Sequence, residues 1–147
     1  MSDSASSEPS PTGGGPLAHS GPVFAALTGL TSLGILLEAV FAGKLINSSS
    51  TGGWLSAHDA NADVLVALAV LTAIYASVVL RATARPLVIG SIVLAALVIA
   101  QTAIGHAITS GSDNGLLVIH VPLAMLVFGL TIWLSVSART LRRSFGG

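Results

Sequence analysis

Four long apolar runs, separated by short polar breaks, constrain this chain more than any other feature of its sequence. A helix needs about 20 predominantly apolar residues to cross the hydrocarbon core of a bilayer. Three runs reach that length, and the second, whose oily part starts at Val64, gains it from the polar turn before it. Because short breaks make consecutive helices antiparallel neighbours, the pattern predicts an all-α integral membrane protein, folded as an antiparallel four-helix bundle. The predicted helices cover residues 23–46, 56–80, 86–108 and 115–136.

The composition excludes an ordinary soluble enzyme. Hydrophobic residues make up 52% of the chain and charged residues 8%, with a mean hydropathy of +0.87, whereas a soluble domain carries about 25% charged residues. The formal net charge is zero, so we expect no nucleic-acid partner. The absence of cysteine excludes disulfides, thiolate metal ligands and a cysteine nucleophile. No nucleophile with its base is recognisable, so we assign no reaction and favour a protein without catalytic activity of its own.

The flanks of this domain, which covers residues 21–138, have a different composition. Residues 1–20 are rich in Ser, Pro and Gly and have almost nothing to bury, which predicts a disordered tail with His19 as a solvated bystander. This tail lacks the basic and apolar regions of a signal peptide. Residues 139–147 are predicted to form a short basic tail.

Basic residues near the helix ends predict the orientation. Arg81 and Arg85 flank the second break and three further arginines follow the fourth run, whereas Lys44 alone marks the opposite side. Because cytoplasmic loops carry an excess of Lys and Arg, we expect the N-terminus, the second break and the C-terminus to be cytoplasmic. The expected location is a bacterial inner membrane, with the lipid bilayer and subunits of a respiratory or other membrane complex as candidate partners.

Several residues are predicted to mark helix ends. Ser56 is expected to cap the second helix, with Asp59 near the positive end of that helix. Pro86 suits the first turn of the third helix. The chain is expected to break between the third and fourth helices, at Gly111, Asn114 and Gly115.

The polar residues of the apolar runs gather in the half of the bundle that we expect to face outward. Ionisable groups within a membrane are costly and usually face a bundle interior or a cavity, so these residues are candidates for a functional site. They are Glu38 in the first run, His58 at the start of the second, Gln101 and His106 near the end of the third, and His120 at the start of the fourth.

His58 and His120 lie on helices that are diagonal partners in a bundle wound in sequence order. Two histidines that face each other across the centre at similar depth can ligate one haem iron from both sides, with the macrocycle between the helices. This arrangement predicts haem b as a cofactor, with His58 and His120 as axial ligands. Glu38 and His106, on the other diagonal, are expected to hydrogen-bond a propionate or to hold a proton.

Other interpretations of these residues stay open. His58 could begin a helix with its ring among the lipid headgroups, and His120 could form an interhelical hydrogen bond. His106 could have a structural role near the end of its helix. A carboxyl at the depth of Glu38 is expected to be protonated or paired. The four side chains also have suitable types for a zinc site, although no metal-ligand spacing supports it.

The segment 93–130 resembles the second half of one four-helix repeat of the haem A synthase family. In that family a Gln-x-x-x-Gly helix precedes a short outer loop, and a haem-ligating histidine then opens the next helix. Gln101, Gly105 and His120 stand at matching positions. The resemblance, which extends over residues 23–138, implies that His58 is the other ligand. The same spacing is similar to that of a family of small bacterial four-helix membrane proteins whose second and fourth helices open with histidine.

The chain departs from the haem A synthase pattern at several points. It has one repeat instead of two, it lacks the outer-loop cysteine pair, and Asp59 stands where the family usually has arginine. The family's glutamate shortly before His58 is missing, and Trp54 and Leu55 stand in that region. These departures argue against oxygenase chemistry, whereas haem binding needs only two imidazoles and a pocket.

The expected function is therefore that of a small membrane protein that binds haem for electron transfer or haem handling. Gln101 joins Glu38 and His106 in the predicted surroundings of the haem. Two alternatives remain: a non-catalytic subunit that stabilises or assembles a larger membrane complex, and a protein that handles quinone, metal or protons.

Overall fold

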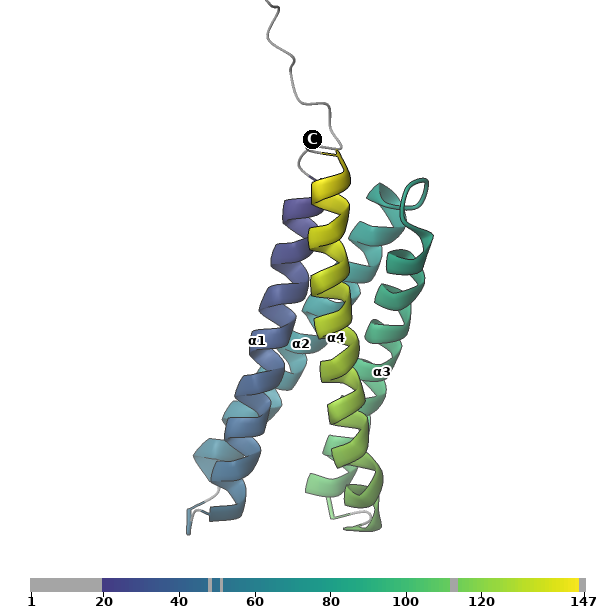
Figure 1. Cartoon of the computed structure of the whole chain (residues 1–147). Coiled ribbons are helices and arrows are strands. Elements are labelled where there is room, and N and C mark those ends of the chain that lie inside the picture. The colour runs from purple at the N-terminus through teal and green to yellow at the C-terminus, as the bar shows by residue number, and fades with distance from the viewer. Residues whose placement is uncertain (1–19, 48, 51, 112–113, 146–147) are drawn as a thin grey trace, which may run out of the picture.

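Four long helices make up the described part of the protein (Figure 1). The computed structural model describes residues 20–47, 49–50, 52–111 and 114–145, and within these ranges all regular structure is helical. The prediction of an all-α, four-helix fold is confirmed, and each helix contains a stretch long and apolar enough to cross a membrane. The elements are α1 (Ser20–Asn47), α2 (Gly52–Val79), α3 (Arg85–Thr109), the one-turn 3-10 helix η2 (Asn114–Leu116) and α4 (Leu117–Phe145).

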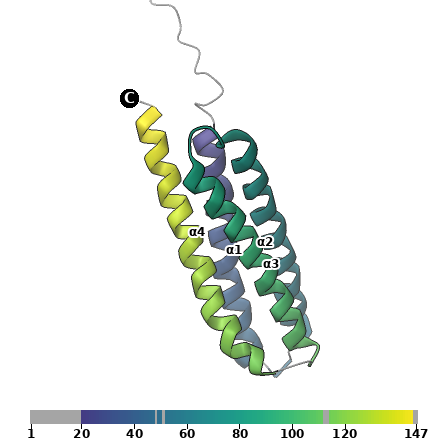
Figure 2. The ribbon, with the colours of Figure 1, turned by 90° about the vertical axis from the view of Figure 1, so that its right-hand side faces the viewer.

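The helices follow one another around the bundle in chain order. Contacts join each helix to the next and α1 to α4, so α2 and α4 are diagonal partners, as are α1 and α3. Figures 1 and 2 show that consecutive helices run antiparallel. The start of α1, the α2–α3 turn and the end of α4 therefore lie together, and we call this the terminal end. The α1–α2 and α3–α4 connections lie at the opposite end, which we call the loop end.

The second helix begins earlier than the sequence predicted. It starts at Gly52, and the hydroxyl of Ser56 donates a hydrogen bond of 3.1 Å to the Gly52 carbonyl oxygen inside the helix. The prediction that Ser56 caps this helix is therefore wrong, because a capping serine lies outside the helical backbone and bonds forward. The extra turn places His58 in the second turn of α2, deeper in the bundle than a helix-opening residue would be.

The predicted tails also differ from what is observed. The basic segment predicted from residue 139 continues α4 as far as Phe145, because residues 137–145 contain neither proline nor glycine. Ser20, placed in the predicted N-terminal tail, is the first residue of α1, and its carbonyl oxygen accepts a 3.2 Å hydrogen bond from the Tyr75 hydroxyl. The rest of that tail, including His19, and residues 146–147 lie outside the described residues.

Two predicted helix signals of α3 are confirmed. Pro86 lies in the first turn of this helix, where its missing N–H has no intrahelical partner to lose. After α3 ends at Thr109, Gly111 adopts a φ of 77°, which only glycine reaches without strain. Gly111 therefore leaves the helical conformation directly after α3, as expected of a residue that breaks the chain there.

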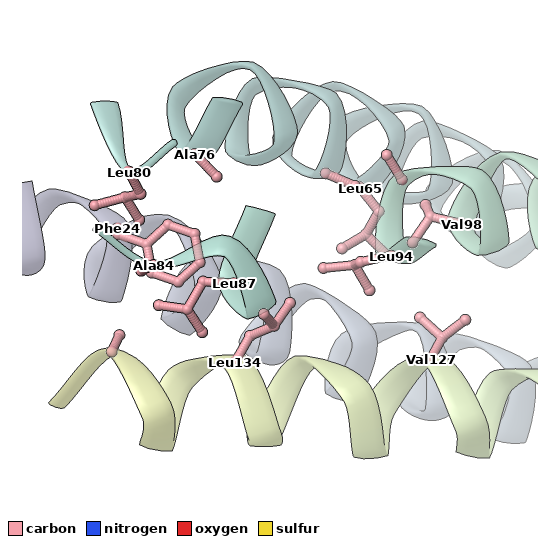
Figure 3. Packing of buried hydrophobic residues seen from close by; sticks show 13 residues of the cluster. Phe24, Leu65, Ala76, Leu80, Ala84, Leu87, Leu94, Val98, Val127 and Leu134 are labelled. Carbon is pink, nitrogen blue, oxygen red and sulfur yellow. The ribbon is translucent and has the colours of Figure 1, made fainter. Parts of the chain in front are cut away.

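The terminal end of the bundle is closely packed. Phe24 and Leu134 are both 0% exposed, and they lie beside Leu80, Ala84 and Leu87 from the α2–α3 turn and the start of α3 (Figure 3). Small hydroxyl residues fill the positions between these apolar side chains without leaving a polar group unsatisfied, because each hydroxyl donates to the carbonyl four residues earlier in its own helix. These fully buried residues are Thr28, Thr31, Thr72, Ser91 and Thr131.

Candidate functional site

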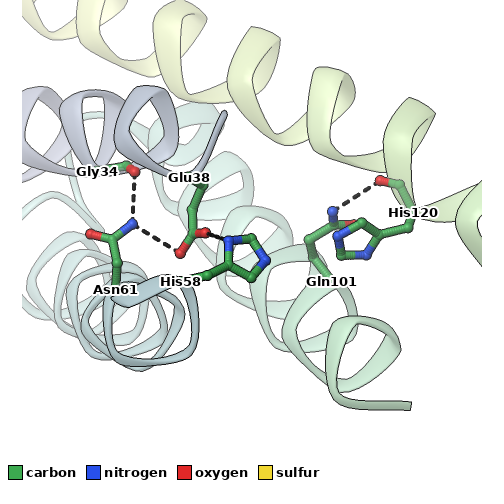
Figure 4. A network of polar contacts seen from close by, with 6 residues as sticks. All are labelled: Gly34, Glu38, His58, Asn61, Gln101 and His120. Atoms are coloured by element: carbon green, nitrogen blue, oxygen red, sulfur yellow. Dashed lines mark hydrogen bonds and ion pairs between the residues drawn. The ribbon is translucent and has the colours of Figure 1, made fainter. Parts of the chain in front are cut away.

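Polar side chains from all four helices gather toward the loop end (Figure 4). Those that make interhelical contacts are Glu38 of α1, His58 and Asn61 of α2, Gln101 of α3 and His120 of α4. They form two groups, one that joins α1 to α2 and one that joins α3 to α4.

The first group is built around Glu38. One carboxylate oxygen, Oε2, contacts Nδ1 of His58, and the other, Oε1, accepts a 2.9 Å hydrogen bond from Nδ2 of Asn61. Nδ2 of Asn61 also donates a 2.9 Å hydrogen bond to the carbonyl oxygen of Gly34. The side chains of Glu38 and His58 are only 17% and 18% exposed. Both carboxylate oxygens of Glu38 therefore have partners, so the carboxyl is paired, as the sequence predicted for an acid at this depth.

Gly34 lets α1 and α2 approach closely enough for this network. A Cβ atom added at Gly34 would lie 2.7 Å from Cδ2 of Leu65, which is closer than carbon atoms tolerate. The glycine therefore allows Leu65 to pack against the α1 backbone one turn below Glu38. This close approach brings Asn61 within reach of the Gly34 carbonyl oxygen.

The second group joins Gln101 to His120. Nε2 of Gln101 donates a 2.9 Å hydrogen bond to the backbone carbonyl oxygen of His120, which can accept because a carbonyl has two lone pairs. Gly105 lies one turn after Gln101, and a Cβ added there would lie 3.3 Å from Cε1 of the His120 ring. Gln101 and Gly105 therefore lie on one face of α3, and the imidazole of His120 packs against this face.

Two polar atoms of this second group are buried without a hydrogen-bond partner among the described residues. They are Oε1 of Gln101 and Nδ1 of His120, and the amide lies beside the imidazole in Figure 4. Buried polar groups are normally paired, so these two atoms are candidates for hydrogen bonds to a water molecule or a ligand.

The rings of His58 and His120 are turned toward each other across the space between the two groups (Figure 4). The rings come from the diagonal helices α2 and α4. Because Nδ1 of His58 contacts Glu38, its other ring nitrogen, Nε2, is the one available to a ligand in that space.

A cavity of about 520 Å³ occupies this space. Its volume falls in the range of about 300–1,000 Å³ that is typical of pockets for small molecules and cofactors. All four helices line it, mostly with aliphatic and small side chains. Its polar lining includes Glu38, Gln101, His58 and His120. Small residues at the lining, among them Ala62, leave the room that a larger side chain would take.

His106 lies apart from the two groups. Its side chain is exposed and lines the edge of the cavity. Among the residues that the structure describes, no group of three or more His, Cys, Asp or Glu side chains is placed to hold a metal ion. The alternative of a zinc site built from Glu38, His58, His106 and His120 is therefore not supported by the arrangement of these side chains.

Sequence reasoning missed Asn61, which completes the contacts of Glu38. One signal was available: Asn61 follows His58 by three residues, so both lie on one face of α2. An amide beside a histidine on the inward face of an apolar helix is a candidate for interhelical hydrogen bonding.

Taken together, the site offers two opposed imidazoles, an apolar cavity between them, and hydrogen-bonding groups behind the rings. This arrangement can hold a flat apolar ligand with a metal at its centre, or it can serve as a set of interhelical contacts. The chain matches no known protein family, no curated protein and no solved structure in the comparisons made. The resemblance to haem A synthase remains a prediction.

Proposed function

We propose that this protein spans a membrane four times, with both termini in the cytoplasm. Large apolar side chains on its outer surface support this proposal, because soluble proteins rarely expose such area. Ile46, Val78 and Val118 are 84%, 76% and 77% exposed, and all four helices have the necessary length and hydropathy. Alkaline phosphatase fused after Gly147 should be inactive in bacteria, because this enzyme matures only outside the cytoplasm. Activity of the fusion would reverse the orientation.

We further propose that the protein binds one b-type haem between His58 and His120. The observation that carries this proposal is the pair of imidazoles from diagonal helices that face one 520 Å³ cavity. Imidazole is a common haem ligand, and cofactor sites in helical bundles are built from facing helices in this way. The haem, when bound, supplies one-electron chemistry, and the protein serves in electron transfer or in haem handling.

The chain's own residues hold and orient the two ligands in this proposal. Glu38 accepts a hydrogen bond from the Nδ1–H of His58, which turns Nε2 toward the cavity and raises the basicity of that nitrogen. Asn61 holds the carboxylate in place through its other oxygen. Nε2 of His120 would hold the iron, which would leave the proton of this imidazole on Nδ1. Oε1 of Gln101, a buried acceptor without a hydrogen-bond partner among the described residues, would then be available to that N–H.

The apolar lining has a separate task. Leu65, Val98 and Val127 are at most 5% exposed and close the side of the cavity nearest the terminal end. Side chains of this kind exclude water from the site, and burial is one of the means by which a protein tunes the reduction potential of a haem.

An absorbance spectrum tests the proposal. The protein purified in detergent from haem-supplemented cells should show a Soret band and, on reduction, sharp α and β bands of low-spin haem. His58→Ala and His120→Ala should each abolish the low-spin spectrum, whereas the matched control His106→Ala should retain it, because that ring lies at the edge of the cavity. A colourless wild-type preparation would reject haem binding.

One observation favours the second candidate, a non-catalytic subunit of a membrane complex. Asn61 and Gln101 each make an interhelical hydrogen bond that needs no cofactor, which is how polar side chains stabilise membrane bundles. The same spectra separate the two candidates, because a folded, colourless protein that copurifies with other subunits supports the second.

A further inference from the structure

The cavity at the loop end extends toward two opposite seams of the bundle. One seam lies between α1 and α4, where Ala39, Gly43 and Ile46 of α1 and Val121 and Met125 of α4 line the cavity. The other lies between α2 and α3, where Asp59, Ala62, Thr102 and His106 line it. The remaining two seams, α1–α2 and α3–α4, are closed by the two polar groups described above.

The positions of these residues around α1 show which neighbour they face. A helix turns by about 100° per residue, so Ala39 and Gly43 lie about 100° and 140° around α1 from Glu38. Glu38 faces α2, because it contacts His58 and Asn61 there. The buried side of α1 lies between the direction of Glu38 and the direction of Ala39 and Gly43. Ala39 and Gly43 therefore lie on the side of α1 that faces its other neighbour, α4.

The cavity-lining residues of α4 can be placed from the contact of this helix with α3. Leu134 faces α3, because a Cβ added at Gly90 of α3 would lie 3.0 Å from its Cδ2 atom. Val121 and Met125 lie about 140° and 180° around α4 from Leu134. Both residues lie on the side of α4 that is turned away from α3, and the other neighbour of α4 is α1. Val121 and Met125 therefore lie at the α1–α4 seam.

The two seams differ in chemistry. The α1–α4 seam is lined by apolar and small residues, and Val121, Met125 and Ile46 are 56%, 72% and 84% exposed. The α2–α3 seam carries a carboxylate, a hydroxyl and an imidazole, from Asp59, Thr102 and His106. Lipid acyl chains are compatible with the first seam, whereas the second favours water or headgroups.

The cavity reaches the outer surface at the α1–α4 seam, because Ala39 and Gly43 of α1 line it and both are exposed. A Cβ added at Gly43 would meet nothing within 4 Å. The lack of a side chain at Gly43 leaves a gap beside the exposed Ala39 on the same face of α1.

We propose that haem reaches this cavity sideways from the bilayer, through the α1–α4 seam, as an amphiphile dissolved in the membrane. This inference rests on the proposed haem site. It adds that the haem comes from the lipid bilayer and exchanges with haem dissolved there.

A matched pair of tryptophan substitutions on α1 tests the route. Gly43→Trp fills the seam at the level of the cavity, whereas Gly29→Trp places the same side chain about 40° away around the helix but nearer the terminal end, outside the cavity lining. A Cβ added at either glycine meets nothing within 4 Å, so both variants should fold. The measurement is the rate at which apo-protein in liposomes acquires the Soret band from haemin dissolved in the same lipid.

We expect Gly43→Trp to slow haem uptake at least about tenfold with an unchanged final spectrum, and Gly29→Trp to stay within about twofold of wild type. Equal rates for the two variants would overturn the route. Faster uptake by wild type from haemin supplied on albumin in the water phase would overturn it as well. In both cases the low-spin spectrum would still uphold the haem site itself.

A second measurement decides the route without haem. The chain has no native cysteine, so Ala124→Cys, at the cavity lining of α4, can carry a bimane fluorophore alone. Nitroxide-labelled lipid should quench this fluorophore more strongly than aqueous iodide, and Gly43→Trp, but not Gly29→Trp, should weaken the quenching by lipid. Stronger quenching by iodide would show that the cavity opens to water and would reject the lateral route, even if no variant binds haem.

Discussion

The two ends of the bundle use small residues for opposite purposes. At the terminal end, Gly90 and buried threonines draw the helices together, so Phe24 and Leu134 are completely covered (Figure 3). At the loop end, glycines and alanines line a cavity, and polar side chains hold the helices in two separate pairs (Figure 4). The difference shows that small residues either close or open a bundle, depending on whether large side chains from a neighbouring helix fill the space beside them.

The comparison also suggests a division of labour. The terminal end has the dense packing that stabilises a helical bundle through many weak contacts. The loop end has a cavity and buried polar atoms, which cost stability unless a ligand or a network compensates. If this division holds, truncations at the two ends should differ in their effects on stability and on haem binding.

The largest expected effect comes from truncating a phenylalanine at each end. Phe24→Ala should lower the free energy of unfolding by about 3–5 kcal/mol, because the ring is 0% exposed and its removal leaves a void. Phe128→Ala, at the cavity lining, should cost only about 1–2 kcal/mol, because part of this side chain already faces open space. Unfolding in mixed micelles with increasing dodecyl sulfate, followed by circular dichroism, measures both. Equal losses would mean that the loop end is as well packed as the terminal end.

The next effect concerns the carboxylate behind His58. Glu38→Gln should weaken haemin binding about 10–100-fold, the usual consequence of removing a carboxylate that orients a ligating histidine. The matched control is Asp63→Asn, an exposed acid on the same helix pair, which should leave the affinity unchanged. Haemin titration followed at the Soret band gives both dissociation constants. If Glu38→Gln binds haemin with the same dissociation constant as the wild type, the carboxylate has only a structural role.

A smaller effect is expected from adding one methyl group to a glycine at each end. Gly90→Ala should destabilise the protein by about 1–2 kcal/mol, because its Cβ would lie 2.9 Å from Cζ3 of Trp133 and 3.0 Å from Cδ2 of Leu134. Gly105→Ala brings a Cβ to 3.3 Å from the His120 ring, and that ring can move into the cavity. Gly105→Ala should therefore cost less in the same unfolding assay, and a larger loss than for Gly90→Ala would contradict the difference between the ends.

The smallest expected effect comes from the Gln101 amide. Gln101→Leu removes the hydrogen bond to the His120 carbonyl oxygen and should cost about 0.6 kcal/mol and at most about 1.7 kcal/mol, the average and the maximum for interhelical hydrogen bonds in a helical membrane protein. Its low-spin spectrum should also broaden as His120 loses its acceptor, a change that lost packing alone would not cause. Thr102→Val, the adjacent residue of the cavity lining, is the control and should keep a sharp spectrum. A sharp spectrum in Gln101→Leu would exclude Gln101 as a positioning residue for His120.

Much of the fold could be predicted from the sequence because the relevant signals are local. Pro86 and Gly111 act through backbone geometry alone, and both lie where predicted. Ser56 shows where this reasoning ends, since its side chain bonds backward to Gly52 inside the helix. Both the capping and the helical conformations suit a serine, so residue type alone does not distinguish them.

The candidate site was predictable only in outline. Chain order and helix length place His58 and His120 on diagonal helices at similar depth. Whether the rings face inward depends on the rotation of each helix about its axis, and helices that are apolar almost all round carry little amphipathic signal to specify that rotation. For the same reason Asn61 was missed, although it contacts Glu38 directly.

By itself, the sequence determined that four apolar helices follow one another with their histidines and acid near one end, because hydropathy, length and helix breakers depend on neighbouring residues only. The tertiary structure alone decided that Glu38 pairs with His58, that Gln101 contacts the backbone of His120, and that a cavity lies between the rings. These features arise from how side chains of different helices fill or leave the space between them, and that depends on all four helices at once.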